Sequence, residues 1–210
     1  MIYKDRSEAA FLLAEKLRKY RGKDGVVVAI PRGGLPVGYV LARYLDFPLD
    51  IALTKKIGHP SNKEYAIGSV SLEGRIIGEE VAPEYIEAET ARLREALCER
   101  YQLYRRDRSP IDLRSKIVIV TDDGIATGNT MLATIELVKA QEPLKVVIAV
   151  PVAPPSTIDY MKGKVDEMIC LQTPEGFGAV GQFYENFESV SDDEAVALLE
   201  RAKAGKEKQL

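Results

Sequence analysis

The chain has 210 residues, of which 46% are hydrophobic and 29% are charged, as is ordinary for a globular protein with a buried core. Its formal net charge of −3 and the absence of a basic patch argue against a protein that binds DNA, RNA or an anionic membrane surface. No apolar run approaches the roughly 18 residues of a membrane span, and the charged N-terminus lacks the features of a signal peptide, so we expect a cytoplasmic protein.

Hydrophobic strands alternate with amphipathic helices along the chain. The first strand, GVVVAIP (25–31), has almost no polar alternation, which is typical of parallel strands covered by helices on both faces. Similar runs predict strands over 48–56, 115–123, 144–154 and 165–174. Periodic segments predict helices over 7–20 with Ser7 as N-cap, and over 35–46, 83–107, 128–141, 156–163 and 191–205. This order predicts an α/β fold with a twisted, mainly parallel sheet flanked by helices.

One stretch interrupts the alternation. Residues 57–66, IGHPSNKEYA, are polar and rich in turn-forming residues, which predicts a mobile loop. Residues 67–78 predict a hairpin with its turn near Glu73 and Gly74. We therefore expect a single domain over 1–210 that carries an inserted hairpin and long helix at about 67–107.

Three unusual segments follow predicted strands, namely PRGG (31–34), TKK (54–56) and TDDGIATGNT (121–130). Ligands of parallel α/β sheets bind beyond the carboxyl ends of the strands, so these segments are the candidate site. The glycine spacing of RGGLPVG does not fit a dinucleotide-binding turn. Cys98, Cys170 and the single His59 cannot supply a conventional zinc site.

The segment GIATGNT (124–130) joins a strand end to a helix start. Small residues allow close backbone approach, and amides at a helix N-terminus bind anions. The hydroxyls of Thr127 and Thr130 add donors. We interpret the segment as a site for a phosphate monoester, formed by Ala126, Thr127, Gly128, Asn129 and Thr130.

Two adjacent aspartates, Asp122 and Asp123, precede this loop. Like charges repel and burial raises their cost, so replacement of either by Asn should leave the fold intact or slightly more stable. Their oxygens suit vicinal sugar hydroxyls, and they could hold Mg²⁺ directly, through water or through ribose hydroxyls. A phosphate site beside a diol site predicts a ribose 5-phosphate ligand. The alternative is that the pair caps the following turn, as we expect of Asp192 and Asp193, which lie beside Ser191 and Glu194 in a capping box of the last helix.

The run IVIVTDDGIATGNT resembles the phosphoribosyl pyrophosphate signature of type I phosphoribosyltransferases, in particular an uncharacterised branch sometimes fused to hydrolases. AIPRGGLPVG resembles the pyrophosphate loop of that family, which implies that the backbone amides of Arg32, Gly33 and Gly34 face the leaving group. LTKKIG resembles the segment whose lysine reaches pyrophosphate, either Lys55 or, as we favour, Lys56; surface lysines at a strand end are the alternative.

The resemblance extends to two further segments. Residues 58–70 resemble the family's mobile catalytic loop and hairpin, and residues from about 172 to 190 resemble the hood that covers the acceptor. In that hood Tyr184 and Phe187 could either stack on a base or form its core. Ala126 stands where enzymes acting on 6-oxopurines carry an acid, which disfavours hypoxanthine and guanine as acceptors.

The resemblance implies an enzyme that transfers ribose 5-phosphate from phosphoribosyl pyrophosphate to a nitrogen nucleophile, such as a nucleobase, and releases pyrophosphate. Asp122, Asp123 and Lys56 would be its catalytic residues, with Mg²⁺ as the cofactor and a homo-oligomer such as a dimer as the assembly. The acceptor stays open. The alternative function is a sensor that binds phosphoribosyl pyrophosphate or a nucleotide in the same pocket without catalysis.

Overall fold

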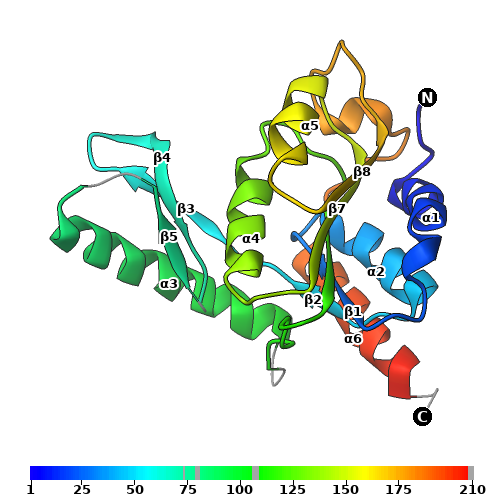
Figure 1. Ribbon diagram of the computed structural model, residues 1–210, viewed down its shortest axis with the longest axis horizontal. Coiled ribbons are helices and arrows are strands. Elements are labelled where there is room, and N and C mark those ends of the chain that lie inside the picture. Colours follow the sequence, from blue (N-terminus) through cyan, green and yellow to red (C-terminus); the bar gives the residue numbers. More distant parts are fainter. Residues whose placement is uncertain (73, 79–80, 106–108, 208–210) are drawn as a thin grey trace.

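A five-stranded parallel sheet forms the centre of the computed structural model, which describes residues 1–72, 74–78, 81–105 and 109–207 (Figure 1). The strand order is β2-β1-β6-β7-β8, and each neighbouring pair is parallel. The strands are β1 (Gly25–Ala29), β2 (Leu49–Ile51), β6 (Ile117–Thr121), β7 (Lys145–Val152) and β8 (Glu167–Gln172). The predicted α/β fold, a mainly parallel sheet flanked by helices, is therefore confirmed.

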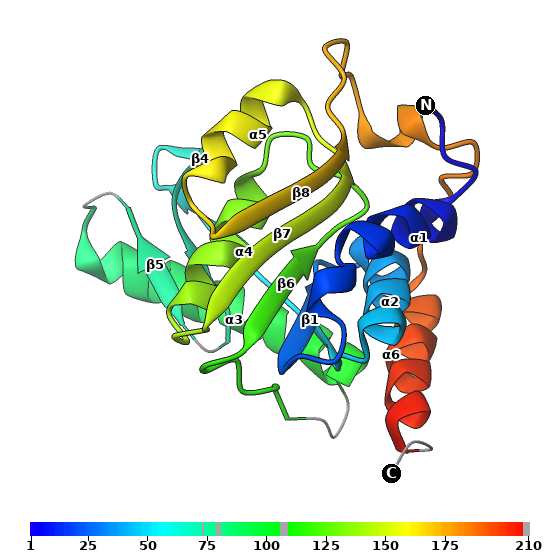
Figure 2. The same ribbon diagram turned by 45° about the vertical axis from the view of Figure 1, so that its right-hand side comes forward.

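Helices cover both faces of this sheet (Figure 2). On one face α1 (Arg6–Lys16) and α2 (Gly34–Leu45) pack against a row that includes Val27 and Ile119. On the other face α4 (Asn129–Lys139) and α5 (Pro155–Lys162) pack against a row that includes Val28 and Val120. Because alternate side chains of a strand point to opposite faces, burial of both faces requires an unbroken hydrophobic run, as the sequence has.

A second, antiparallel sheet and a long helix form an arm that projects from this body (Figure 1). The arm consists of β3 (Lys55–His59), β4 (Asn62–Val70), β5 (Arg75–Ile77) and α3 (Pro83–Arg105). Its buried side chains, including Ile57, Ile67 and Leu93, form one apolar cluster with Leu199 of α6 (Asp192–Glu207). The arm is thus packed onto the body through its own hydrophobic core.

A buried ion pair lies at the root of the arm, where the chain leaves and rejoins the body. Nη2 of Arg105 lies 2.7 Å from Oδ1 of Asp50 and donates to the carbonyl of Ile51 at 3.3 Å. Oδ2 of Asp50 accepts the amide of Ile111 at 3.0 Å. These contacts join the end of α3, the end of β2 and the returning chain, so they help to fix the arm on the sheet.

Residues 57–66 differ from their prediction as a mobile loop, because they belong to the β3–β4 hairpin, whose strands pair from Lys55 opposite Val70 to His59 opposite Asn62. Pairing of backbone groups overrides the polar composition of the segment. The strand predicted over 48–56 is divided into β2 and the start of β3, since the chain leaves the sheet after Ile51.

Smaller differences concern element ends. The N-cap of α1 is Asp5, whose carboxylate accepts the amides of Ser7 and Glu8, and not Ser7; the helix ends at Lys16 and a 3₁₀ helix, η1 (Arg18–Tyr20), follows. The hairpin predicted at 67–78 corresponds to β4 and β5, although Glu73 in its predicted turn lies outside the described residues. The predicted end of the long helix at 106–107 lies outside them as well. Of the helices in the described ranges, none has both the length and the apolar character needed to cross a membrane.

Candidate active site

The aspartate pair lies where the central strand β6 ends, beside the turn that follows β1. The amide of Ile30 donates to the carbonyl of Thr121 at 2.9 Å, which holds the two chain segments together. A cavity of about 340 Å³ opens there, which we call the aspartate cavity. Its lining residues are Arg6, Pro31, Arg32, Gly33, Asp122, Asp123, Phe187, Ser189 and Val190. The predicted Asp122, Asp123, Arg32 and Gly33 are therefore brought together.

The two glycines of PRGG are required by this close approach. A Cβ on Gly33 would lie 2.2 Å from Oδ2 of Asp123, and a Cβ on Gly34 would lie 2.9 Å from the Cα of Asp122. The peptide between Pro31 and Arg32 is cis. The amide of Gly34 donates to the carbonyl of Ile30 at 3.0 Å, so it is engaged within the turn instead of facing a leaving group.

Burial and mutual repulsion dominate the electrostatics of the pair. Burial, and then the neighbouring charge of Asp123, raise the pKa of Asp122 well above its ordinary value. Burial also raises the pKa of Asp123, but the guanidinium of Arg6 opposes this shift. Nε of Arg6 lies 2.8 Å from Oδ2 of Asp123, and the two side chains are only 11% and 12% exposed. The site thus places two carboxylates and the guanidinium of Arg6 at the wall of an open cavity, with little of the Arg6 and Asp123 side chains exposed.

Helix capping does not account for the pair. The N-cap of α4 is Gly128, and no side chain caps that helix. Oδ1 of Asp122 accepts the amide of Asp123 at 2.8 Å, and Oδ2 of Asp123 is bonded to Arg6, so neither bond caps a helix. In the last helix Oγ of Ser191 accepts the amide of Glu194 at 3.1 Å, whereas the carboxylate of Asp192 binds Arg32 and Tyr104 instead of capping the helix.

Arg32 lines the cavity but points toward α6. Its Nη1 lies 3.3 Å from Oδ1 of Asp192, and both side chains are 46% exposed. The hydroxyl of Tyr104 donates to the same carboxylate oxygen. Because the Arg32–Asp192 pair is half exposed, it is weak and an anionic ligand could compete for the guanidinium.

The predicted phosphate loop precedes α4. Gly128 has φ of +82°, a left-handed conformation that favours glycine, and a Cβ there would lie 2.4 Å from Cε of Met161. Ala126 is held by its carbonyl, which accepts the hydroxyl of Thr157 at 2.9 Å. Ala126, Thr127, Asn129 and Thr130 are exposed. The loop is therefore fixed by its backbone while its surface faces solvent.

A second space, which we call the arm cleft, lies between the arm and α4 and has a volume of about 430 Å³. It is lined by Lys56, Asn129 and Thr130 among others, whereas Lys55 lines neither the arm cleft nor the aspartate cavity. Two groups of predicted site residues thus line separate spaces. Lys56, Asn129 and Thr130 line the arm cleft, and Arg32, Gly33, Asp122 and Asp123 line the aspartate cavity.

Tyr184 and Phe187 are candidates either for a stacking surface for a base or for the core of the hood, and their contacts in the structure differ. Tyr184 is 6% exposed, packs against Tyr3 with ring centroids 5.4 Å apart and donates its hydroxyl to the carbonyl of Asp123 at 2.6 Å. Tyr184 therefore belongs to the core of the hood. Phe187 lines the aspartate cavity, but its ring contacts both Tyr184, at 5.1 Å between centroids, and the guanidinium of Arg6, at 4.0 Å.

Arg6 is the site residue that sequence reasoning missed. As an arginine at the start of an amphipathic helix, it has no local signal that distinguishes it from a solvated side chain. Only its proximity to Asp123, 117 positions later, reveals its place in the site.

The chemistry of the site fits a metal only in part. No group of three or more His, Cys, Asp or Glu side chains arranged for a metal exists within the described ranges. Mg²⁺ commonly takes one or two carboxylates and completes its shell with water and substrate oxygens. Asp122 and Asp123 therefore fit a cation that a ligand helps to hold.

Known proteins resemble this chain over most of its length. The family model for the phosphoribosyl transferase domain matches residues 2–188. Proteins from two strains of Mycobacterium tuberculosis, each named "Putative phosphoribosyl transferase", are 40% identical over 208 residues, which cover 96% of this chain and 47% of theirs. The chain thus spans about half the length of these curated relatives. The crystal structure of TT1426 from Thermus thermophilus is 38% identical, with a TM-score of 0.87 and coverage of 95% of this chain and 98% of that one. The chain belongs to the phosphoribosyl transferase family.

Proposed function

We propose that this protein transfers ribose 5-phosphate from phosphoribosyl pyrophosphate to a nitrogen nucleophile and releases pyrophosphate. The observation that carries the proposal is the aspartate cavity, in which Asp122 and Asp123 lie against the turn containing Arg32 and Gly33. Family membership supports the same reaction class.

Each part of the donor has a counterpart among these residues. The carboxylates of Asp122 and Asp123 would accept the ribose hydroxyls, and the loop from Ala126 to Thr130 would bind the 5-phosphate through amides and hydroxyls. Arg32, the amide of Gly33 and Lys56 would bind pyrophosphate; Lys56 is favoured over Lys55 because it shares the arm cleft with Asn129 and Thr130. Charge-assisted contacts of this kind are among the stronger ones available.

In the reaction the acceptor nitrogen forms a bond to the anomeric carbon while the bond from that carbon to pyrophosphate breaks. The expected transition state resembles an oxocarbenium ion, so the residues of the chain mainly orient the ring and stabilise the departing charge. Mg²⁺, when bound, would neutralise part of the pyrophosphate charge. Asp122 and Asp123 would orient the ring through its hydroxyls.

The acceptor is a nucleobase-like molecule in this proposal. The position of Phe187 at the aspartate cavity supports entry of the acceptor from the hood side. A homo-oligomeric assembly stays a prediction from the resemblance, and a cytoplasmic location stays a prediction from the sequence.

Thermal unfolding with ligands tests the donor site. Phosphoribosyl pyrophosphate with Mg²⁺ should raise the melting temperature, because a ligand that binds only the folded state stabilises it. Ribose 5-phosphate with Mg²⁺ should do less, since it lacks pyrophosphate. No shift with either at millimolar concentration would refute the proposal. Pyrophosphate release with a panel of bases then tests transfer, and donor binding without transfer to any base would favour the sensor.

A further inference from the structure

Arg6 makes three contacts that join separate parts of the site. Its Nε lies 2.8 Å from Oδ2 of Asp123, and its Nη1 donates to the carbonyl of Glu188 at 2.8 Å. Its guanidinium carbon lies 4.0 Å from the centre of the Phe187 ring. One side chain from the start of α1 thus contacts an aspartate of the donor site and two residues of the hood.

The contact between Arg6 and Asp123 makes Arg6 the positively charged partner of the aspartate pair in the protein without ligand. Arg32 lines the same cavity, but its Nη1 lies 3.3 Å from Asp192 on α6. Two carboxylates in a site of low exposure need a nearby positive charge, and a buried charge without a partner is strongly destabilising. Arg6 supplies that charge at hydrogen-bond distance.

A bound cation would compete with Arg6 for the same carboxylate. Mg²⁺ binds carboxylate oxygens at about 2.0–2.1 Å, and two cations that bind one carboxylate of low exposure repel each other. The metal ion of a donor complex could therefore replace the guanidinium of Arg6 at the carboxylate of Asp123.

We propose that Arg6 is a displaceable counter-ion, which occupies Asp123 until the cation of the donor complex replaces it and which thereby releases the hood. The proposal rests on the function proposed above, because that function supplies the cation. It concerns a residue outside the segments that resemble the family's motifs.

Release of the hood follows from the other contacts of Arg6. The adjacent chain is held by the amides of Glu185 and Asn186, which donate to the carbonyls of Tyr3 and Lys4 at 2.8 and 3.0 Å. A second cavity, of about 350 Å³, is lined by Arg6, Ser189 and Val190, which also line the aspartate cavity. Movement of Arg6 would break its bond to Glu188 and its contact with Phe187 and would alter both cavities, so it would loosen the segment that carries Phe187.

A Mn²⁺ titration in the absence of donor tests whether Arg6 competes with a cation, because the two possible roles of Arg6 predict opposite changes in cation affinity when Arg6 is replaced. Mn²⁺, a spectroscopic probe for Mg²⁺, should bind Arg6→Gln more tightly than wild type, by about fivefold or more, because the internal competitor is gone. Arg6→Lys should lie between the two, and Lys16→Gln, an exposed change on the same helix, should match wild type. In the Asp123→Asn background, the additional change Arg6→Gln should not increase the affinity for Mn²⁺. Equal or weaker Mn²⁺ binding by Arg6→Gln would overturn the proposal and make Arg6 a fixed positioning residue.

Hydrogen exchange in the wild-type protein provides a readout that does not depend on whether the variant folds. Saturation with Mn²⁺ and phosphoribosyl pyrophosphate should speed exchange at Glu185 and Asn186, and unliganded Arg6→Lys should already show part of that increase. Slower exchange of these amides on ligand binding would contradict the release of the hood. If phosphoribosyl pyrophosphate fails to bind while the Mn²⁺ contrast persists, the donor assignment fails and the counter-ion role of Arg6 stands.

Discussion

Gly33 lies against the carboxylate of Asp123, so closely that a Cβ on Gly33 would come within 2.2 Å of Oδ2 and 2.7 Å of Cγ of that aspartate. The turn after β1 can thus pack against the residues that follow β6 only because residue 33 has no side chain. The position of the carboxylate that we assign to the donor depends on a residue of the preceding turn.

Gly33→Ala should therefore displace Asp123 and weaken binding of phosphoribosyl pyrophosphate about tenfold or more, with a loss of roughly 1–3 kcal/mol in stability from overpacking. Isothermal titration calorimetry and thermal unfolding would measure the two effects. Gly163→Ala is the matched control, because a Cβ there meets no atom within 4 Å. Unchanged donor affinity in Gly33→Ala would show that the carboxylate position does not matter.

The two aspartates should differ in what their replacement does to stability. Asp122→Asn removes a carboxylate whose burial and repulsion from Asp123 are unfavourable, so the variant should melt at the same temperature as wild type or higher. Asp123→Asn weakens the bond to Arg6 and should cost about 1–3 kcal/mol. The expectation from sequence is that both changes leave the fold intact or slightly more stable, so the predicted loss of stability in Asp123→Asn departs from it. Both variants should lose donor affinity; equal melting temperatures for the two would contradict the role of Arg6.

The lysines after β2 form a second matched pair. Lys56 lines the arm cleft with Asn129 and Thr130, whereas Lys55 lines neither space. Lys56→Met should weaken binding of pyrophosphate and of its phosphoribosyl ester by about tenfold, the loss of roughly one charge-assisted contact. Lys55→Met should have a much smaller effect. Competition binding with inorganic pyrophosphate would measure both, and a larger loss in Lys55→Met would reverse the assignment.

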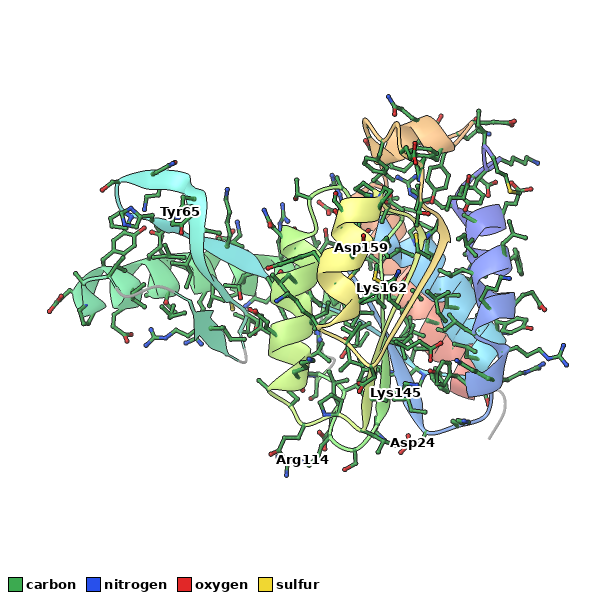
Figure 3. All side chains as sticks on the ribbon, turned by 45° about the horizontal axis from the view of Figure 1, so that its top comes forward. Asp24, Tyr65, Arg114, Lys145, Asp159 and Lys162 are labelled. Atoms are coloured by element: carbon green, nitrogen blue, oxygen red, sulfur yellow. The ribbon has the colours of Figure 1, made fainter. Side chains whose placement is uncertain are left out.

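Glu167 lies far from the candidate site and should make the free energy of unfolding depend on pH. Burial alone would raise its pKa, but hydrogen bonds from Lys19, Tyr20 and Lys145 lower it to about 2. Lys145 lies at the end of the molecule that also carries Asp24 and Arg114, where the strands begin (Figure 3). The aspartate pair lies at the carboxyl ends of those strands.

Because the pKa of Glu167 is lower in the folded protein than the ordinary value of 4.5, the ionised group stabilises the fold above that value. This contribution should disappear as the pH falls from 4.5 toward 2. Glu167→Gln should be less stable than wild type at pH 7, with the difference shrinking over that window in urea unfolding. The control is Asp159→Asn, whose exposed pair with Lys162 spans 3.7 Å and should contribute little at any pH. A difference for Glu167→Gln that persists at pH 2 would assign the effect to packing.

The sequence by itself determined the order of the core elements and the nature of the candidate site. Strands such as 25–29 and 117–121 are recognisable because a strand buried on both faces must be hydrophobic throughout, a property written in consecutive residues. The pair Asp122–Asp123 and the loop up to Thr130 are equally local, since strand, turn and helix start adjoin along the chain. The rule that ligands bind at the carboxyl ends of parallel strands then located the site.

Tertiary structure alone decided which distant groups complete that site. Arg6 reaches Asp123 across 117 positions because α1 packs on one face of the sheet with its first residue at the carboxyl edge, a placement that no local pattern encodes. Backbone pairing converted the polar segment 57–66 into the hairpin that carries Lys56 into the arm cleft. Pairing and packing between segments far apart in the chain depend on the whole fold, so the sequence could name the aspartates but not the arginine that neutralises them.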